Sequence, residues 1–274
     1  MRILIATGGS EHSKVAVQMG AALAETVPLE VTILTVIKRA GQQAEAQRIV
    51  AEARQILGTA VPHVRTKIRQ GKPADTILRE LRDGRYDLVI LGEREHHTFI
   101  AHIFNATTGD RIIHQAYCPV LIAKKAARPV HSLLLCDSGL SGPTLLDRLQ
   151  QQLPELLQSN PEVTILHVMS QISAGPGVKG EQLRADADVL IQERSPEGDL
   201  LARDLQQLSQ EGVSARPKIR HGLVVDEILD ESVCGDYDLI VIGAHQGKGW
   251  QRFLLEDLME RIVLGSDRPV LIIQ

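Results

Sequence analysis

VTILTV at residues 31–36 returns as VTILHV at residues 163–168, with five of the six letters unchanged. YDLVILG at residues 86–92 returns in the same way as YDLIVIG at residues 237–243. Segments that recur in the same order are the sequence signature of a duplicated structural unit. The chain therefore carries two copies of one unit.

Two further pairs extend the repeat along each copy: KIRQG (67–71) with KIRHG (218–222), and CPVLIA (118–123) with RPVLII (268–273). The segments VTILTV and VTILHV are separated by 132 residues, whereas the three later pairs are separated by 150 or 151. About 19 residues are therefore added in the second copy after residue 168. This stretch contains SAGPGVKGEQ (173–182) and SPEGD (195–199), whose Gly, Pro and Ser residues predict a surface loop before a helix.

Length and charge fit two soluble domains, which we place at residues 1–127 and 128–274. The first domain carries a formal charge of +5 and the second −9, and neither is basic enough to predict nucleic-acid binding. No apolar stretch is long enough to span a membrane. Three scattered cysteines without metal-ligand spacing predict reduced thiols and a cytoplasmic location.

In each copy, short apolar runs alternate with segments of helical spacing. The runs are continuous rather than alternating, which is typical of parallel strands buried on both faces. Apolar residues at helical spacing predict the helix that follows the first strand; they are Val15, Met19 and Ala22 in one copy and Leu145, Leu146 and Leu149 in the other. Gly58 and Gly212 stand where a long polar helix would end. The sequence predicts an α/β chain of two tandem, doubly wound, five-stranded parallel sheets.

In such a sheet, ligands bind outside the carboxyl ends of the strands, where the strand order reverses. If the first strand is central, this place lies between the first and fourth strands of each copy. Thr7–Ser10 and Gly92 would lie there in the first copy, and Cys136–Gly139 and Gly243 in the second.

ILIATGGSEHS (3–13) resembles the first-strand signature A-T-D-G-S-x-x-S of the universal stress protein family. The fourth-strand segments and the terminal CPVLI (118–122) resemble the last third of the same family, and the resemblance covers nearly the whole chain twice. It implies a tandem member with the adenine-nucleotide alpha-hydrolase-like fold of universal stress proteins. Some members bind ATP through the first-strand Asp and a G-x-x-G-x9-G-[S/T] loop. Glycines in that loop let backbone N–H groups approach phosphate, at a helix N-terminus that favours anions.

The first copy departs from this pattern. Gly8 stands in place of the Asp, the final G-[S/T] pair falls on Ala106–Thr107, and the segment between has no glycine. A tight phosphate loop is therefore not expected in the first copy.

The second copy keeps more of the pattern, although Gln246 replaces the second glycine. The final pair falls on Glu256–Asp257, which we expect at a helix start, where two carboxylates suit the helix dipole but repel a triphosphate. The resemblance yields these nucleotide-binding candidates: Asp137, Val168, Ile242, Gly243, Gly247 and Gly249. Val168 and Ile242 also fit ordinary strand packing, and Asp137 also fits a turn former bonded to backbone.

No catalytic residue or metal site is predicted. His96, His97 and His102 lack the i, i+4 spacing of a helical zinc site, and no Ser–His–Asp arrangement is indicated. We expect a cytoplasmic, non-catalytic regulatory or ligand-sensing protein with degraded nucleotide motifs, and with no certain cofactor. Two alternatives stay open: a protein that binds ATP or another adenine nucleotide in the second copy only, with or without slow hydrolysis, and a pure interaction scaffold.

The last strands of the two copies, PVLIA (119–123) and PVLII (269–273), are apolar and end their units. Single-domain members of the family commonly dimerise through this strand. An unpaired apolar edge favours aggregation. We therefore expect the two domains to pair with each other through these strands, and the sequence leaves a homodimer open.

Overall fold

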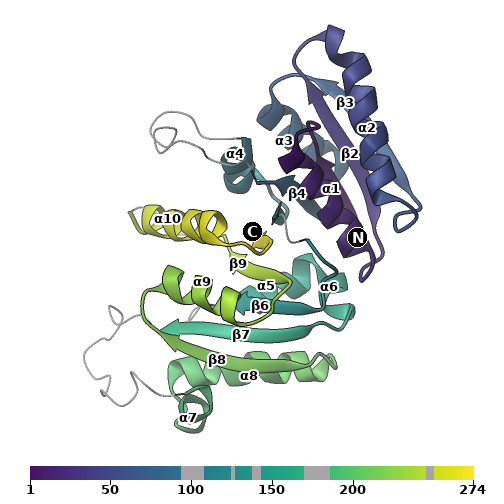
Figure 1. Cartoon of the computed structure of the whole chain (residues 1–274). Helices are drawn as coiled ribbons and strands as arrows, with labels where there is room; N and C mark the ends of the chain where they lie inside the picture. The colour runs from purple at the N-terminus through teal and green to yellow at the C-terminus, as the bar shows by residue number, and fades with distance from the viewer. Residues whose placement is uncertain (94–107, 125–126, 138–142, 170–185, 245–249) are drawn as a thin grey trace. The chain divides into compact units, whose positions relative to one another are not determined.

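A computed structural model describes the backbone of residues 1–93, 108–124, 127–137, 143–169, 186–244 and 250–274. In the segment 250–257 only the backbone is described. The chain forms two compact units, Met1–Pro129 and Val130–Ile273, each with its own sheet (Figure 1). We call them unit 1 and unit 2.

The sheet of unit 1 has five parallel strands in the order β3-β2-β1-β4-β5. The strands are β1 (Arg2–Ala6), β2 (Glu30–Ile37), β3 (Val64–Gln70), β4 (Leu88–Gly92) and β5 (Val120–Ala123). The middle residues of β1 are buried one after another, which shows that helices cover both faces of the sheet. The strand order reverses between β1 and β4, as the sequence predicts.

Unit 2 repeats this arrangement, with parallel strands in the order β10-β9-β6-β7-β8. The strands are β6 (Ser132–Cys136), β7 (Glu162–Met169), β8 (Ala215–His221), β9 (Leu239–Gly243) and β10 (Val270–Ile273). The predicted fold of two doubly wound parallel sheets in tandem is confirmed.

The helices of unit 1 are α1 (Glu11–Ala24), α2 (Gln43–Leu57), α3 (Pro73–Gly84) and α4 (Thr108–Gln115), with a 3-10 turn, η1 (Ala40–Gln42), before α2. Helix α1 packs with α2, and α3 packs with α4. Ser10 begins α1 because its hydroxyl accepts a hydrogen bond from the Ser13 N–H. Gly58, with a φ of 54°, ends α2 in the left-handed conformation that glycine tolerates.

The helices of unit 2 are α5 (Leu145–Gln152), α6 (Pro154–Gln158), α7 (Ala187–Gln192), α8 (Pro196–Gln210), α9 (Val224–Cys234) and α10 (Trp250–Gly265). Short helix α7 has no counterpart in unit 1 and packs on α8. The prediction that SPEGD (195–199) belongs to a loop is wrong, because these residues begin α8. Ser195 accepts a hydrogen bond from the Gly198 N–H, Pro196 opens the first turn, and Glu197 and Asp199 suit the helix dipole.

A polar trio around a buried glutamate occurs in both units and supports the duplication. In unit 1 the Glu80 carboxylate of α3 lies 2.5 Å from Lys67 Nζ of β3 and accepts the hydroxyl of Tyr86 at 2.9 Å. In unit 2 Glu231, Lys218 and Tyr237 repeat these contacts at 2.7 Å each. Charged and hydroxyl partners offset the cost of burying each glutamate.

Candidate functional site

At the carboxyl end of β1, the backbone N–H groups of Gly8 and Gly9 already have partners inside the chain. Ser13 Oγ accepts from the Gly8 N–H at 3.2 Å, and Thr7 Oγ1 accepts from the Gly9 N–H at 3.4 Å. Gly9 has a φ of +79°, and an added Cβ would lie 2.6 Å from the Ile49 side chain, so this glycine serves the turn and its packing. The glycines after β1 therefore do not offer free N–H groups to a phosphate.

The end of β4 in unit 1 is closed by α1. A Cβ on Gly92 would lie 1.8 Å from the backbone oxygen of His12, in the first turn of that helix. Next to this contact, Glu93 and the buried Lys124 form an ion pair. Gly92 thus allows a helix to pack closely. The other predicted phosphate-loop positions of this unit, Ala106–Thr107, lie outside the described residues.

In unit 2, Asp137 follows β6 and is 5 % exposed. Its Oδ2 accepts a hydrogen bond from the Leu145 N–H at 2.9 Å, at the first residue of α5. Its backbone oxygen lies 3.1 Å from Nδ1 of the buried His167 on β7. Asp137 therefore joins the end of β6 to the start of α5. This contact fits the alternative in which Asp137 bonds to backbone rather than to a ligand.

Arg148 of α5 reaches across to the end of β9. Its Nη1 donates to the Ala244 oxygen at 3.1 Å, and a Cβ on Gly243 would lie 2.4 Å from Nη2. Its Nε is buried without a hydrogen-bond partner among the described residues. Burial lowers the pKa of Arg148, whereas the nearby Asp137 raises it. A guanidinium thus covers the glycine that the sequence assigns to phosphate.

A second carboxyl group, Asp204 of α8, is fully buried, and neither of its oxygens has a hydrogen-bond partner in the described part of the chain. Burial raises its pKa to about 7, with a further contribution from the charge of Asp137. The sequence does carry a signal for this residue, because Asp204 falls on the apolar stripe of α8 between Leu201 and Leu208.

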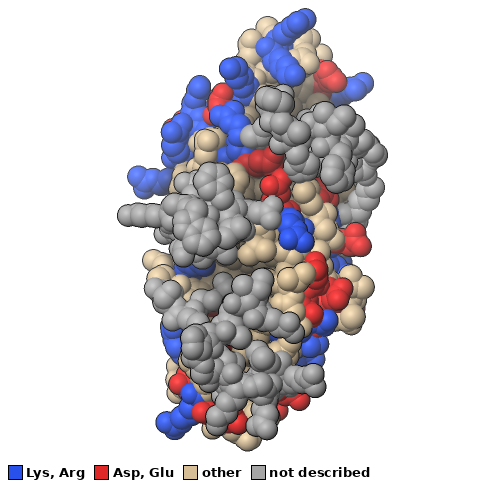
Figure 2. Space-filling model, turned by 90° about the vertical axis from the view of Figure 1, so that its left-hand side faces the viewer, with Lys and Arg blue, Asp and Glu red and all other residues tan. Residues whose placement is uncertain are grey.

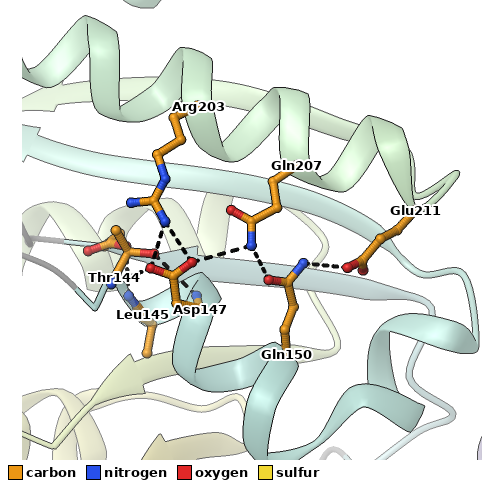
Figure 3. A network of polar contacts seen from close by, with 8 residues as sticks. Thr144, Leu145, Asp147, Gln150, Arg203, Gln207 and Glu211 are labelled. Carbon is orange, nitrogen blue, oxygen red and sulfur yellow. Dashed lines mark hydrogen bonds and ion pairs between the residues drawn. The ribbon is translucent and has the colours of Figure 1, made fainter.

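Helices α5 and α8 are joined by a polar network at the edge of this site (Figure 3). Asp147 caps its own helix with Thr144 and accepts Nη2 of Arg203 at 2.7 Å on both oxygens. Gln207 joins Asp147 to Gln150. Burial acts to raise the pKa of Asp147, but the hydrogen bonds from Arg203, the Thr144 backbone and Gln207 outweigh it and lower the pKa to about 2. Because Arg203 faces Asp147, it does not form an ion pair with Asp204.

The remaining candidates from the sequence are only partly brought together. Ile242 is buried in β9, paired with Ile272, and Val168 is half-buried near the end of β7. Gly247 and Gly249 lie outside the described residues, as do Gln246 and the three histidines at 96, 97 and 102. No group of three or more potential metal ligands is found among the residues that the structure describes. None of the described helices is long and apolar enough to cross a membrane.

Glu256 and Asp257 do not lie at a helix start. Helix α10 begins at Trp250, so both residues stand more than a turn inside it, where the helix N-terminus no longer favours carboxylates. The expectation is wrong because it transferred the family's loop length to a chain whose last helix begins earlier.

The family model of the universal stress proteins matches residues 1–124 and again residues 138–274. The chain belongs to the universal stress protein family. A universal stress protein from Archaeoglobus fulgidus is similar over 100 % of this chain and 96 % of its own, with a TM-score of 0.74 and 17 % identity. A functionally unknown protein from Pseudomonas aeruginosa is similar over 99 % and 92 %, with a TM-score of 0.67 and 15 % identity. No curated protein sequence matches the chain. At these identities the solved structures support the universal stress protein fold and nothing finer.

Proposed function

We propose that this universal stress protein is a non-catalytic cytoplasmic regulator whose unit 2 binds a small, polar, anionic ligand between the carboxyl ends of β6 and β9. The proposal rests on Arg148, whose guanidinium lies over Gly243 and close enough to Asp137 for their charges to interact. Nε of Arg148 has no partner among the described residues, so one strong donor is left for a ligand. An arginine suits planar carboxylates and phosphates.

Unit 1 offers less to such a ligand. Its Gly8 and Gly9 N–H groups are bonded to Ser13 and Thr7, and α1 packs against Gly92. Unit 2 also holds the buried Asp204, whose carboxyl group is a donor when protonated and an acceptor when ionised. Together, a cation and two carboxyl groups can distinguish both ends of a polar molecule.

Mass spectrometry of small molecules released from the purified protein tests the proposal. We expect a ligand to co-purify with the parent and to be lost from Arg148→Leu, because the variant cannot hold an anionic group. Arg268→Leu is the control. This arginine precedes β10, at the amino ends of the strands rather than at their carboxyl ends, and it pairs with Asp236. A ligand retained equally in both variants, or absent from the parent, would contradict the proposal.

ATP or another adenine nucleotide in unit 2 is the second candidate, favoured by the presence of Asp137 and Gly243. Phosphate could approach Gly243 only if Arg148 turned away, since its guanidinium now fills that space. Calorimetric titration with ATP separates the candidates: affinity that is lost in Asp137→Ala favours the nucleotide. If the protein binds neither ATP nor a co-purified ligand, the scaffold alternative remains.

A further inference from the structure

A cavity lies in unit 1, at the amino ends of its strands rather than at their carboxyl ends. It has a volume of about 300 Å³ and opens at the amino ends of β1, β2 and β3. Arg2, the first residue of β1, lies on its wall, and the buried Thr32 and Tyr86 line it more deeply. Arg54 of α2 and Arg65 of β3 are exposed and complete the positive rim.

The charge of this cavity is not neutralised from within. Three arginines line it, against one carboxylate, Glu30. The Arg2 guanidinium lies 5.9 Å from the centre of the Tyr86 ring, and no ion pair joins Arg2, Arg54 or Arg65 to any described residue. Elsewhere arginines of this chain do have carboxylate partners, as Arg203 has in Asp147. Unpaired arginines around one cavity form a site for an anion.

Unit 2 shows what the same positions look like when they are used for structure. Arg216 pairs with Thr164 in the register of β7 and β8, as Arg65 pairs with Thr32 in unit 1. Its Nε donates to Thr164 Oγ1 at 2.9 Å, whereas Arg65 has no such bond with a described residue. Ser132 holds the register position of Arg2, opposite Glu162 as Arg2 is opposite Glu30. Unit 2 therefore has no arginine at the position of Arg2, and its counterpart of Arg65 is bonded to Thr164.

We propose that this cavity of unit 1 binds a small molecule through a phosphate or diphosphate group. Arginine is suited to phosphate because its planar guanidinium can donate two parallel hydrogen bonds. The volume stands at the lower end of ligand pockets, which fits a compact molecule rather than a long one. The positive charge of unit 1 attracts such an anion over longer distances, and Figure 2 shows Lys and Arg side chains gathered along one side of that unit.

Titration of the full chain with inorganic phosphate and with pyrophosphate, followed by phosphorus NMR, tests this site. We expect both anions to bind, pyrophosphate more tightly, with affinity falling as salt is raised. Arg65→Gln and Arg54→Gln should each weaken pyrophosphate binding about tenfold, the typical effect of losing one charge-assisted hydrogen bond. Both side chains are exposed, so the fold should be kept.

Arg216→Gln is the matched control, because it removes the same charge at the same register position in unit 2. Its affinity for pyrophosphate should equal that of the parent. Equal weakening in Arg65→Gln and Arg216→Gln would show general charge attraction and overturn the proposal. Failure of both anions to bind the parent would also overturn it, even if a phosphopeptide or nucleic acid did bind.

Discussion

Asp204 lies in surroundings that disfavour the charged form of its carboxyl group. Its carboxyl group is fully buried and its pKa is raised to about 7, far above the ordinary value for aspartate. The unfolded chain therefore releases this proton first as pH rises. Between about pH 4 and pH 7 the folded state binds more protons, so Asp204 makes stability fall across that window, by up to about 4 kcal/mol in total.

Asp204→Leu should remove this fall. We expect the variant to be more stable than the parent at pH 8, by about 2 kcal/mol after the loss of local packing, and to gain little at pH 4. Urea unfolding followed by fluorescence of Trp250, the single tryptophan and a residue of unit 2, measures the difference. Asp199→Leu, at an exposed position of the same helix, should show the parent's pH dependence. An unchanged pH dependence in Asp204→Leu would contradict the prediction.

A residue of the candidate site could be predicted where its position in the repeat identifies it. It could not be predicted where its role depends on a contact between its side chain and another helix or strand. Asp137 is identified because it follows β6 at the family's first-strand position. Arg148 could not be identified, since its role depends on how α5 lies over Gly243, and no local pattern records that approach. Asp204 lies between these cases: its place on an apolar stripe is visible in the sequence, but its loss of solvent depends on packing.

Among the elements, α7 and α8 show where pattern reasoning fails. The strands and the long helices follow from continuous apolar runs and helical spacing, and their order follows from the repeat. The loop prediction for SPEGD fails because the helix-start signal of Ser195 and Pro196 outweighs the turn signal of Gly and Pro. The glycine at position 198 is required by packing, because a Cβ there would lie 2.0 Å from the Leu190 oxygen of α7.

Gly198→Ala should therefore destabilise unit 2. Alanine ordinarily favours a helix over glycine by about 1 kcal/mol, but here the added carbon meets backbone that must shift, at a typical cost of about 1–3 kcal/mol. We expect a net loss of stability in urea unfolding followed at Trp250. Gly41→Ala is the control, because a Cβ there meets nothing within 4 Å. A stabilised Gly198→Ala would mean that α7 does not pack as closely as this contact requires.

At the scale of the whole molecule, the last strand of each unit's own sheet decides how the units can associate. Val89 N–H donates to the Pro119 oxygen and Glu93 N–H to the Ala123 oxygen, so the odd-numbered residues of β5 face β4. The backbone of Ile122 therefore points to the other side of β5. In unit 2, the bonds to Pro269 and Ile273 place the backbone of Ile272 on the side of β10 that points away from β9.

We predict that the two units pair within one chain through the side of β5 that points away from β4 and the side of β10 that points away from β9. Both strands are apolar. Pairing them would satisfy the N–H and C=O groups that favour aggregation when an edge strand is left unpaired. The opposite formal charges of the two halves, +5 and −9, add a weak attraction that salt screens. Ile122→Pro should separate the units without loss of either fold, because the donor that proline removes is not one used by β4.

Small-angle X-ray scattering of Ile122→Pro should show a larger radius of gyration than the parent, with the circular dichroism of a folded chain. Ile122→Ala is the control, since it shortens the side chain but keeps the N–H, and it should stay as compact as the parent. Ultracentrifugation distinguishes the homodimer, in which the same edges would join two chains. A parent dimer that Ile122→Pro converts to monomers of unchanged compactness would show that each edge pairs with another copy, and the intramolecular prediction would be wrong.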